Sequence, residues 1–263
     1  MPYANVNGLR IHYEVRGEGS PVVLIGGLGS QISSWATQAP LYSKYFKVIA
    51  FDNRGAGLSD KPDDSYTTED MADDTAGLLD SLGIHSASFV GKSMGGMIGQ
   101  WLGIKYPDRV NKLVLGCTSP SRDDVGNEIL RIGREIATKV GLKTVWLTAL
   151  FLGYTREYIE KNLVAIKESL ALVTENEEAI NGYIGQSLAC EKHNTRDLLH
   201  KIKCPTLVLL GERDQIASPW KSRELGELIP GAILREFSGV GHGFWRERQE
   251  EVDKVVLDFL LER

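Results

Sequence analysis

A serine between glycines has the setting in this chain that most strongly indicates chemistry. Ser93 lies in residues 91–95, Gly-Lys-Ser-Met-Gly, after an apolar run that ends at Val90 and before a helical pattern. This arrangement predicts a sharp strand-to-helix turn that presents a hydroxyl above the edge of a sheet. The glycines remove side chains that would clash in such a strained turn. We therefore predict that Ser93 is a nucleophile.

A serine hydroxyl is a weak nucleophile unless a base takes its proton. Only one of the five histidines, His242, follows the last strand pattern, in the glycine-rich loop 239–244. The chain order serine, acid, histidine puts the base at such a place. We predict that His242 is the base. The other histidines lie in or beside different patterns: His12, His85, His193 and His200.

The base needs a carboxylate that fixes its tautomer and stabilises the imidazolium. Asp214 follows the strand pattern 206–210 and lies between Ser93 and His242 in the chain. Open α/β sheets place ligand sites at the carboxyl ends of strands, so Asp214 is the predicted acid. The rivals are a carboxylate in the same loop and two after an earlier strand: Glu212, Asp123 and Asp124.

Acyl transfer through a serine also requires two backbone N–H donors for the negatively charged oxygen. One donor should be Met94, the residue after the nucleophile. The other should come from the glycine loop 26–29, which follows an early strand pattern. Leu28 is the predicted donor in that loop, and Gly27 is the alternative.

The elements that must position these residues alternate along the chain. The strand patterns cover 10–15, 22–25, 47–51, 87–90, 112–115, 206–210 and 233–237. Between them, Thr67 with Asp70 predicts a helix that begins with a capping box, and Ser218 predicts a cap before a proline. Strands and helices joined by short connections predict an α/β fold with a mostly parallel sheet covered by helices.

One long block interrupts this alternation. Residues 120–196 show helical patterns and no convincing strand. We predict that they form a helical cap on a core made of residues 1–119 and 197–263. Inside the cap, the apolar run 145–152 either lines a substrate pocket or packs onto the core, and the sequence leaves both open.

Composition narrows the class of protein. The chain has 263 residues, 42% hydrophobic and 25% charged, which is ordinary for a globular protein. Its net charge of −5 argues against nucleic acid or anionic membrane as the partner. The three cysteines have no metal-ligand spacing, the longest apolar stretch is too short to cross a bilayer, and the first residues do not resemble a signal peptide. We expect a cytoplasmic protein.

A further motif carries a family resemblance. Residues 51–60, Phe-Asp-Asn-Arg-Gly-Ala-Gly-Leu-Ser-Asp, resemble the D-x-R-G-x-G-x-S turn of the α/β-hydrolase superfamily. The chain is similar to that superfamily over nearly its whole length. It is most similar to 3-oxoadipate enol-lactonase-like carboxylesterases, over residues 26–35, 71–83 and 106–110 besides the turn and the serine motif. The resemblance implies an eight-stranded sheet with an inserted helical cap.

Two departures from the family pattern accompany this resemblance. Gly26 and Gly27 stand where the family often has His-Gly, and Lys92 is a less usual residue before the nucleophile. The ammonium of Lys92 either favours anionic substrates or points into solvent, and we predict the second.

Together these features predict a serine hydrolase that cleaves a small to medium, hydrophobic ester or lactone through an acyl-enzyme. No metal or organic cofactor is expected, because the triad chemistry needs none and the chain has no motif for one. A C–C bond hydrolase, a cofactor-free perhydrolase and a slow-turnover ligand receptor remain as alternatives on the same fold. The expected partner is the small-molecule substrate, and self-association stays open.

Overall fold

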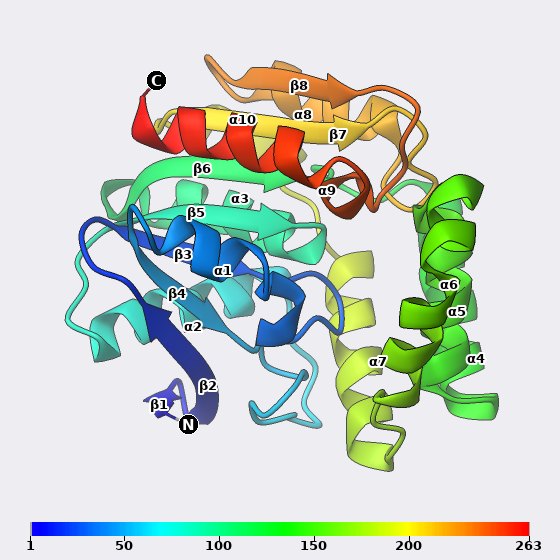
Figure 1. The fold of residues 1–263 in the computed structure, drawn as a ribbon. Coiled ribbons are helices and arrows are strands. Elements are labelled where there is room, and N and C mark those ends of the chain that lie inside the picture. Colours follow the sequence, from blue (N-terminus) through cyan, green and yellow to red (C-terminus); the bar gives the residue numbers. More distant parts are fainter. Residues whose placement is uncertain (1, 263) are drawn as a thin grey trace.

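A single sheet of eight strands organises the protein. The computed structural model describes residues 2–262, and its strands run in the order β1-β2-β4-β3-β5-β6-β7-β8 (Figure 1). The strands are β1 (Tyr3–Val6), β2 (Leu9–Arg16), β3 (Pro21–Ile25), β4 (Lys47–Phe51), β5 (Ala87–Lys92), β6 (Val110–Gly116), β7 (Thr206–Gly211) and β8 (Ile233–Phe237). Pairing is antiparallel at β1–β2 and β2–β4 and parallel from β4 to β8. The predicted mostly parallel sheet is confirmed.

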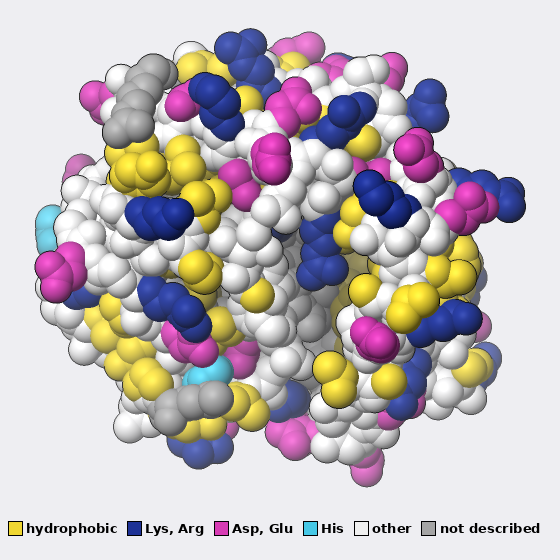
Figure 2. Space-filling model, in the orientation of Figure 1, with side chains coloured by type: hydrophobic (Ala, Val, Ile, Leu, Met, Phe, Trp, Pro, Cys, Tyr) yellow, Lys and Arg dark blue, Asp and Glu magenta, His cyan; other side chains and the backbone are white. Residues whose placement is uncertain are grey.

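Four long helices lie together beyond the carboxyl ends of the central strands (Figure 1). They are α4 (Asp124–Lys139), α5 (Leu142–Gly153), α6 (Arg156–Ala171) and α7 (Glu177–Glu191). All four come between β6 and β7, and the described residues of 120–196 contain no strand beyond one bridge from Ser121 to Asn194. Figure 2 shows the surface hollowed between these helices and the sheet-bearing part of the molecule. The division into core and cap at the stated boundaries stays a prediction.

The remaining helices cover the two faces of the sheet. They are η1 (Ile32–Trp35), α1 (Gln38–Tyr42), α2 (Thr68–Ser81), α3 (Met94–Lys105), η2 (Pro107–Arg109), η3 (Arg196–Lys201), α8 (Pro219–Leu228), α9 (Phe244–Glu247) and α10 (Gln249–Leu261). Side chains of α2, α3 and α8 pack on one face, and side chains of α1, α9 and α10 pack on the other. None of the helices among the described residues is long and apolar enough to cross a membrane.

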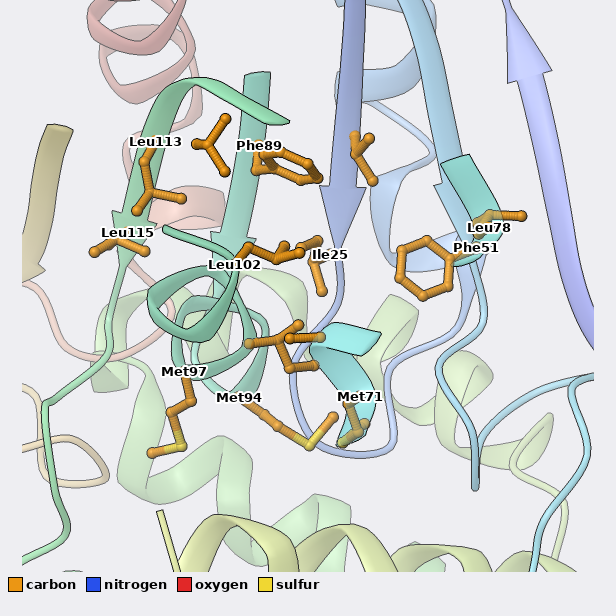
Figure 3. Packing of buried hydrophobic residues seen from close by; sticks show 14 of the residues in the cluster. Ile25, Phe51, Met71, Leu78, Phe89, Met94, Met97, Leu102, Leu113 and Leu115 are labelled. Atoms are coloured by element: carbon orange, nitrogen blue, oxygen red, sulfur yellow. The ribbon is translucent and has the colours of Figure 1, made fainter. Parts of the chain in front are cut away.

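The core explains why the central strands read as continuous apolar runs. A parallel strand covered on both faces has no polar side, so β3 and β5 bury almost every side chain. Figure 3 shows Ile25 and Phe89 from these strands against Met94 and Leu102 of α3. This packing fixes α3 directly beneath the end of β5, which is where Ser93 lies.

Two predicted helix starts have different outcomes. Thr67 and Asp70 form the predicted capping box, in which the N–H of Asp70 donates to Thr67 Oγ1 at 3.2 Å and the N–H of Thr67 donates to Asp70 Oδ2 at 2.8 Å. Pro219 begins α8, but Ser218 makes no capping bond. Ser218 is the N-cap residue before Pro219, as predicted, but its hydroxyl donates to Asp123 and not to the backbone of α8.

Strand β1 has no counterpart among the predicted strand segments. It is a four-residue edge strand in which Ala4 and Val6 are buried and alternate with exposed residues. Such a short alternation carries little signal, and the strand is defined by its antiparallel pairing with β2.

Candidate active site

Ser93 occupies a strained turn between β5 and α3. Its backbone angles are φ 55° and ψ −117°, a conformation that non-glycine residues rarely adopt, and its N–H donates to the carbonyl of Gly116 at 2.8 Å. A β-carbon on Gly91 would overlap the carbonyl of Gly95, and one on Gly95 would overlap the carbonyl of Ile25. Both glycines of the motif are therefore required for α3 to turn back so closely under the sheet.

His242 and Asp214 are joined by a hydrogen bond of 2.7 Å between Nδ1 and Oδ2. The other carboxylate oxygen of Asp214 accepts the backbone N–H groups of Ile216 and Ala217, both at 2.8 Å. The side chain of Asp214 has no exposed surface. An ionised carboxylate only accepts hydrogen bonds, so this pairing puts the imidazole proton on Nδ1 and leaves Nε2 as the basic atom.

The rival carboxylates are engaged elsewhere. Glu212 accepts hydrogen bonds of 2.8 Å from Ser238 Oγ and from the N–H of Gly239, and the backbone hydrogen bond holds its pKa below the usual value. Asp123 caps α4 by accepting the N–H of Gly126 at 2.7 Å. Asp124 is exposed in the first turn of α4. Of the four carboxylates considered from the sequence, the structure brings only Asp214 to a histidine.

The other histidines lie away from this pair. His12 is buried on β2 and bonds to a buried aspartate of the core. His193 is buried after α7, where burial lowers its pKa to about 3. His85 and His200 are exposed. The structure therefore leaves His242 as the histidine near the serine turn.

The glycine loop after β3 runs beside the serine. A β-carbon on Gly27 would lie 3.2 Å from Ser93 Cβ, so the backbone of the loop passes within contact distance of Ser93. Leu28, the next residue, lines the same pocket as Ser93. Met94 opens α3, and the first N–H groups of a helix have no acceptor within the helix. This leaves the Met94 N–H available to a ligand.

A glutamine of α7 holds this loop in place. Gln186 of α7 accepts the N–H of Gly29 at 2.7 Å, and its Nε2 donates to the carbonyl of Arg54 at 2.6 Å. The side chain is completely buried. Gln186 was not predicted from the sequence, since one polar residue in a helical pattern gives no sign of a partner more than 150 positions away.

Ser93, His242, Leu28 and Met94 all line a pocket of about 700 Å³. Much of the rest of its wall is apolar, and α4 and α5 supply a large part of it, including Leu130, Ile136, Val145, Trp146, Ala149, Leu150 and Leu152. The run 145–152 thus lines the pocket, whereas Phe151 within it is 61% exposed. No hydrogen bond joins Ser93 to His242 within residues 2–262, and such bonds are often long before substrate binds.

The predicted orientation of Lys92 is wrong. Its Nζ lies 3.7 Å from the ring centroid of Trp35 and 4.4 Å from that of Trp245, and the residue lines the pocket. The reason is the two-residue period of a strand, because Lys92 projects to the same face of β5 as Val90. That face is covered by the cluster that contains both tryptophans, so the ammonium meets indole rings instead of solvent.

Comparisons with known proteins agree with this arrangement. Residues 20–245 match the family described as alpha/beta hydrolase fold. The "Putative carbamate hydrolase RutD" of Caulobacter sp. (strain K31) is 31% identical, and the match covers 99% of this chain and 98% of that protein. The 3-oxoadipate enol-lactonase 2 of Acinetobacter baylyi is 30% identical over 85% of this chain and 83% of its own.

Solved structures give the same result. The enol-lactonase from Burkholderia xenovorans LB400 has a TM-score of 0.92 and 32% identity to this chain, and the match covers 99% of this chain and 100% of that one. The similarity to enol-lactonases seen in the sequence motifs is confirmed. The chain belongs to the α/β-hydrolase family and is a hydrolase.

Proposed function

We propose that the protein hydrolyses carboxylic esters or lactones through an acyl-enzyme on Ser93. One observation carries the proposal: a histidine fixed by a buried aspartate shares a pocket with a serine on a strained strand-to-helix turn. The roles are nucleophile for Ser93, general base for His242 and orienting acid for Asp214. These three side chains come from different loops at the carboxyl end of one sheet, where α/β folds place their ligand sites.

The chemistry follows from this arrangement in two halves. Ser93 Oγ attacks the substrate carbonyl while its proton passes to His242 Nε2, and Asp214 stabilises the imidazolium. The N–H groups of Leu28 and Met94 donate to the oxyanion of the tetrahedral intermediate. His242 then returns the proton to the leaving alcohol, which stays attached to the acyl group when the substrate is a lactone. A water molecule, activated by the same histidine, releases the acid.

The pocket supports a small to medium substrate with hydrophobic parts. Its volume of about 700 Å³ lies within the usual range for ligand pockets, and α4 and α5 supply an apolar wall. Two of the relatives are named enol-lactonases, which agrees with attack on a lactone carbonyl. In this proposal residues 120–196 act as a cap that sets the shape of the pocket over the core of residues 1–119 and 197–263.

The cysteines support a cytoplasmic location, which we include in the proposal. Cys117, Cys190 and Cys204 are free thiols, and the first two are buried. Proteins of oxidising compartments more often pair their cysteines. Fractionation of source cells would test this, and recovery from a secreted or periplasmic fraction would contradict it.

Covalent labelling tests the proposed nucleophile. A fluorophosphonate probe should add once, with peptide mapping to Ser93, and Ser93→Ala should lower kcat by roughly 10⁴-fold or more. Ser30→Ala is the matched control, because Ser30 is another serine of the pocket wall and should leave labelling intact. Labelling at a different residue, or substantial turnover of esters by Ser93→Ala, would overturn the mechanism.

A further inference from the structure

The charge of the pocket is opposite to that of the protein. The chain carries a net charge of −5, yet among the described residues that line the pocket there is no aspartate or glutamate. Three lining residues are cationic: Lys92, Arg122 and Arg246. Figure 2 shows Lys or Arg atoms inside the hollow between the helical block and the sheet. A cationic pocket in an acidic protein indicates selection by charge.

Lys92 is held by aromatic rings and not by an anion. Its ammonium lies against Trp35 and Trp245, and no ion pair to it is found within residues 2–262. The charge of Asp253 favours the ammonium of Lys92, but this carboxylate already accepts hydrogen bonds from Trp245 Nε1 at 3.0 Å and Tyr42 Oη at 2.9 Å. Indole faces attract a cation, but they do not neutralise it.

A second cation lies at the same part of the pocket. Arg246 follows Trp245 on α9, is exposed, lines the pocket and forms no ion pair among the described residues. Burial, with a smaller contribution from the positive charge of Arg246, lowers the pKa of Lys92 to about 7, so the two charges repel each other. Ser34, beside Trp35, adds a hydroxyl to this stretch of the wall. Two like charges and the Ser34 hydroxyl, with no aspartate or glutamate among the described lining residues, leave a place for an anion.

Arg122 lies in a different environment. Its Nη2 donates to the carbonyl of Gly126 at 2.9 Å, and burial lowers the pKa of its guanidinium although the nearby Asp123 favours the charge. Its Nε is buried without a partner, so this atom is closed to a ligand. Arg122 is therefore held by a hydrogen bond to a carbonyl, whereas no hydrogen bond or ion pair is found for the side chains of Lys92 and Arg246 among the described residues.

We propose that Lys92, Arg246 and Ser34 form a subsite for a carboxylate on the substrate, so that the enzyme prefers esters or lactones that carry an anionic group. The preference in turnover rests on the proposed hydrolysis, whereas the binding of an anion at this subsite does not depend on it. The carboxylate would accept hydrogen bonds from the ammonium, the guanidinium and the hydroxyl, and it would relieve the repulsion between the two cations. The apolar wall would take the rest of the molecule.

Binding without turnover gives the decisive experiment. In a Ser93→Ala background, calorimetry compares monomethyl glutarate, which is anionic, with dimethyl glutarate, which is neutral. The anion should bind more tightly by roughly tenfold or more, as expected for charge-assisted hydrogen bonds. Adding Lys92→Met should remove most of this preference, and adding Arg246→Met should reduce it. Arg248→Met is the matched control, since Arg248 is exposed two residues further along and does not line the pocket.

Kinetics then separate the two proposals. Wild-type kcat/KM is compared for nitrophenyl pentanoate and nitrophenyl hemiglutarate, and for the ethyl and carboxymethyl esters of butyrate. In at least one pair the anionic ester should have the higher kcat/KM, and Lys92→Met should lower the ratio of kcat/KM for the anionic ester to that for the neutral one. Equal binding of the two glutarates, or a preference that survives both Lys92→Met and Arg246→Met, overturns the subsite. Preferred binding of the anion with no hydrolysis of any ester or lactone overturns the proposed function alone.

Discussion

Changing Asp214 to asparagine tests the geometry of the proposed triad most directly. One oxygen of Asp214 accepts two backbone N–H groups, from Ile216 and Ala217, and the other faces His242 Nδ1. An asparagine has one oxygen, and the two N–H donors require it. Its NH₂ group must then face His242. Because that group only donates, Nδ1 would have to accept, and the ring proton would move to Nε2.

The structure also indicates how far kcat should fall in Asp214→Asn. The opposite amide orientation would leave both backbone N–H groups buried without an acceptor, at a cost of about 1–3 kcal/mol each. The switched tautomer avoids this cost, so we expect it to dominate. With a proton on Nε2, His242 cannot take the proton of Ser93, and kcat should fall by roughly 10⁴-fold, as in serine proteases with the same change. Stability should change little, because Asp214→Asn keeps the number of hydrogen bonds.

The assay is steady-state hydrolysis of a short-chain nitrophenyl ester, with thermal melting as the check on folding. Glu212→Gln is the matched control, because Glu212 lies in the same loop but bonds to Ser238 and the backbone of Gly239. A folded Asp214→Asn that keeps more than about a tenth of the wild-type kcat would refute the tautomer argument. An equal loss in Glu212→Gln would refute the assignment of the acid.

Three further predictions follow from the surroundings of the site. Gln186→Leu should lower kcat by roughly tenfold or more, with less change in KM, because the N–H of Gly29 loses the bond that holds the proposed oxyanion loop. A lower melting temperature with unchanged kcat would instead mean that Gln186 has a purely structural role. Lys92→Met should raise the free energy of unfolding by on the order of 2 kcal/mol below pH about 7. The reason is that burial lowers the pKa of Lys92 to about 7 in the folded protein, whereas in the unfolded chain the lysine has its ordinary pKa of about 10.4. The native state binds fewer protons than the unfolded state between these values, so the gain should shrink as pH rises from about 7 to about 10.4, and denaturant titrations at several pH values would measure it. Trp146→Ala should shift ester preference toward longer acyl groups because the indole lines the pocket, whereas Leu147→Ala, at a more exposed position, should not.

The parts of this protein that sequence could predict depend on local pattern and chain order. The glycines around Ser93 indicate a turn where a β-carbon does not fit, and the structure has such a turn. Apolar runs of covered strands give the sheet, and the order of loops along the chain puts Asp214 and His242 after β7 and β8. These inferences need only neighbouring residues and the rule that ligand sites lie at the carboxyl ends of strands.

The parts that sequence could not predict depend on side-chain contacts between distant segments. Gln186 reaches the glycine loop from α7, and the side chain of the N-cap residue Ser218 bonds to Asp123 instead of to the backbone of α8. No periodicity encodes such partners. Lys92 is a different case, because the alternation of β5 already places it on the same face as Val90. The prediction that it points into solvent failed because the covering layer contributes Trp35 and Trp245 to that face.

The bonds between the helical block and the loops of the site bear on how substrate enters. The N–H of Gly243, next to the proposed base, donates to the carbonyl of Gly153 at 2.7 Å, and Thr155 bonds to Glu247 on α9. Gln186 ties α7 to the glycine loop on the opposite side of the serine. A swing of the whole block would break all of these bonds and displace both loops of the proposed site. Entry through the existing mouth of the pocket disturbs none of them, so changes in the block should alter kcat through the loops as well as KM through the pocket wall.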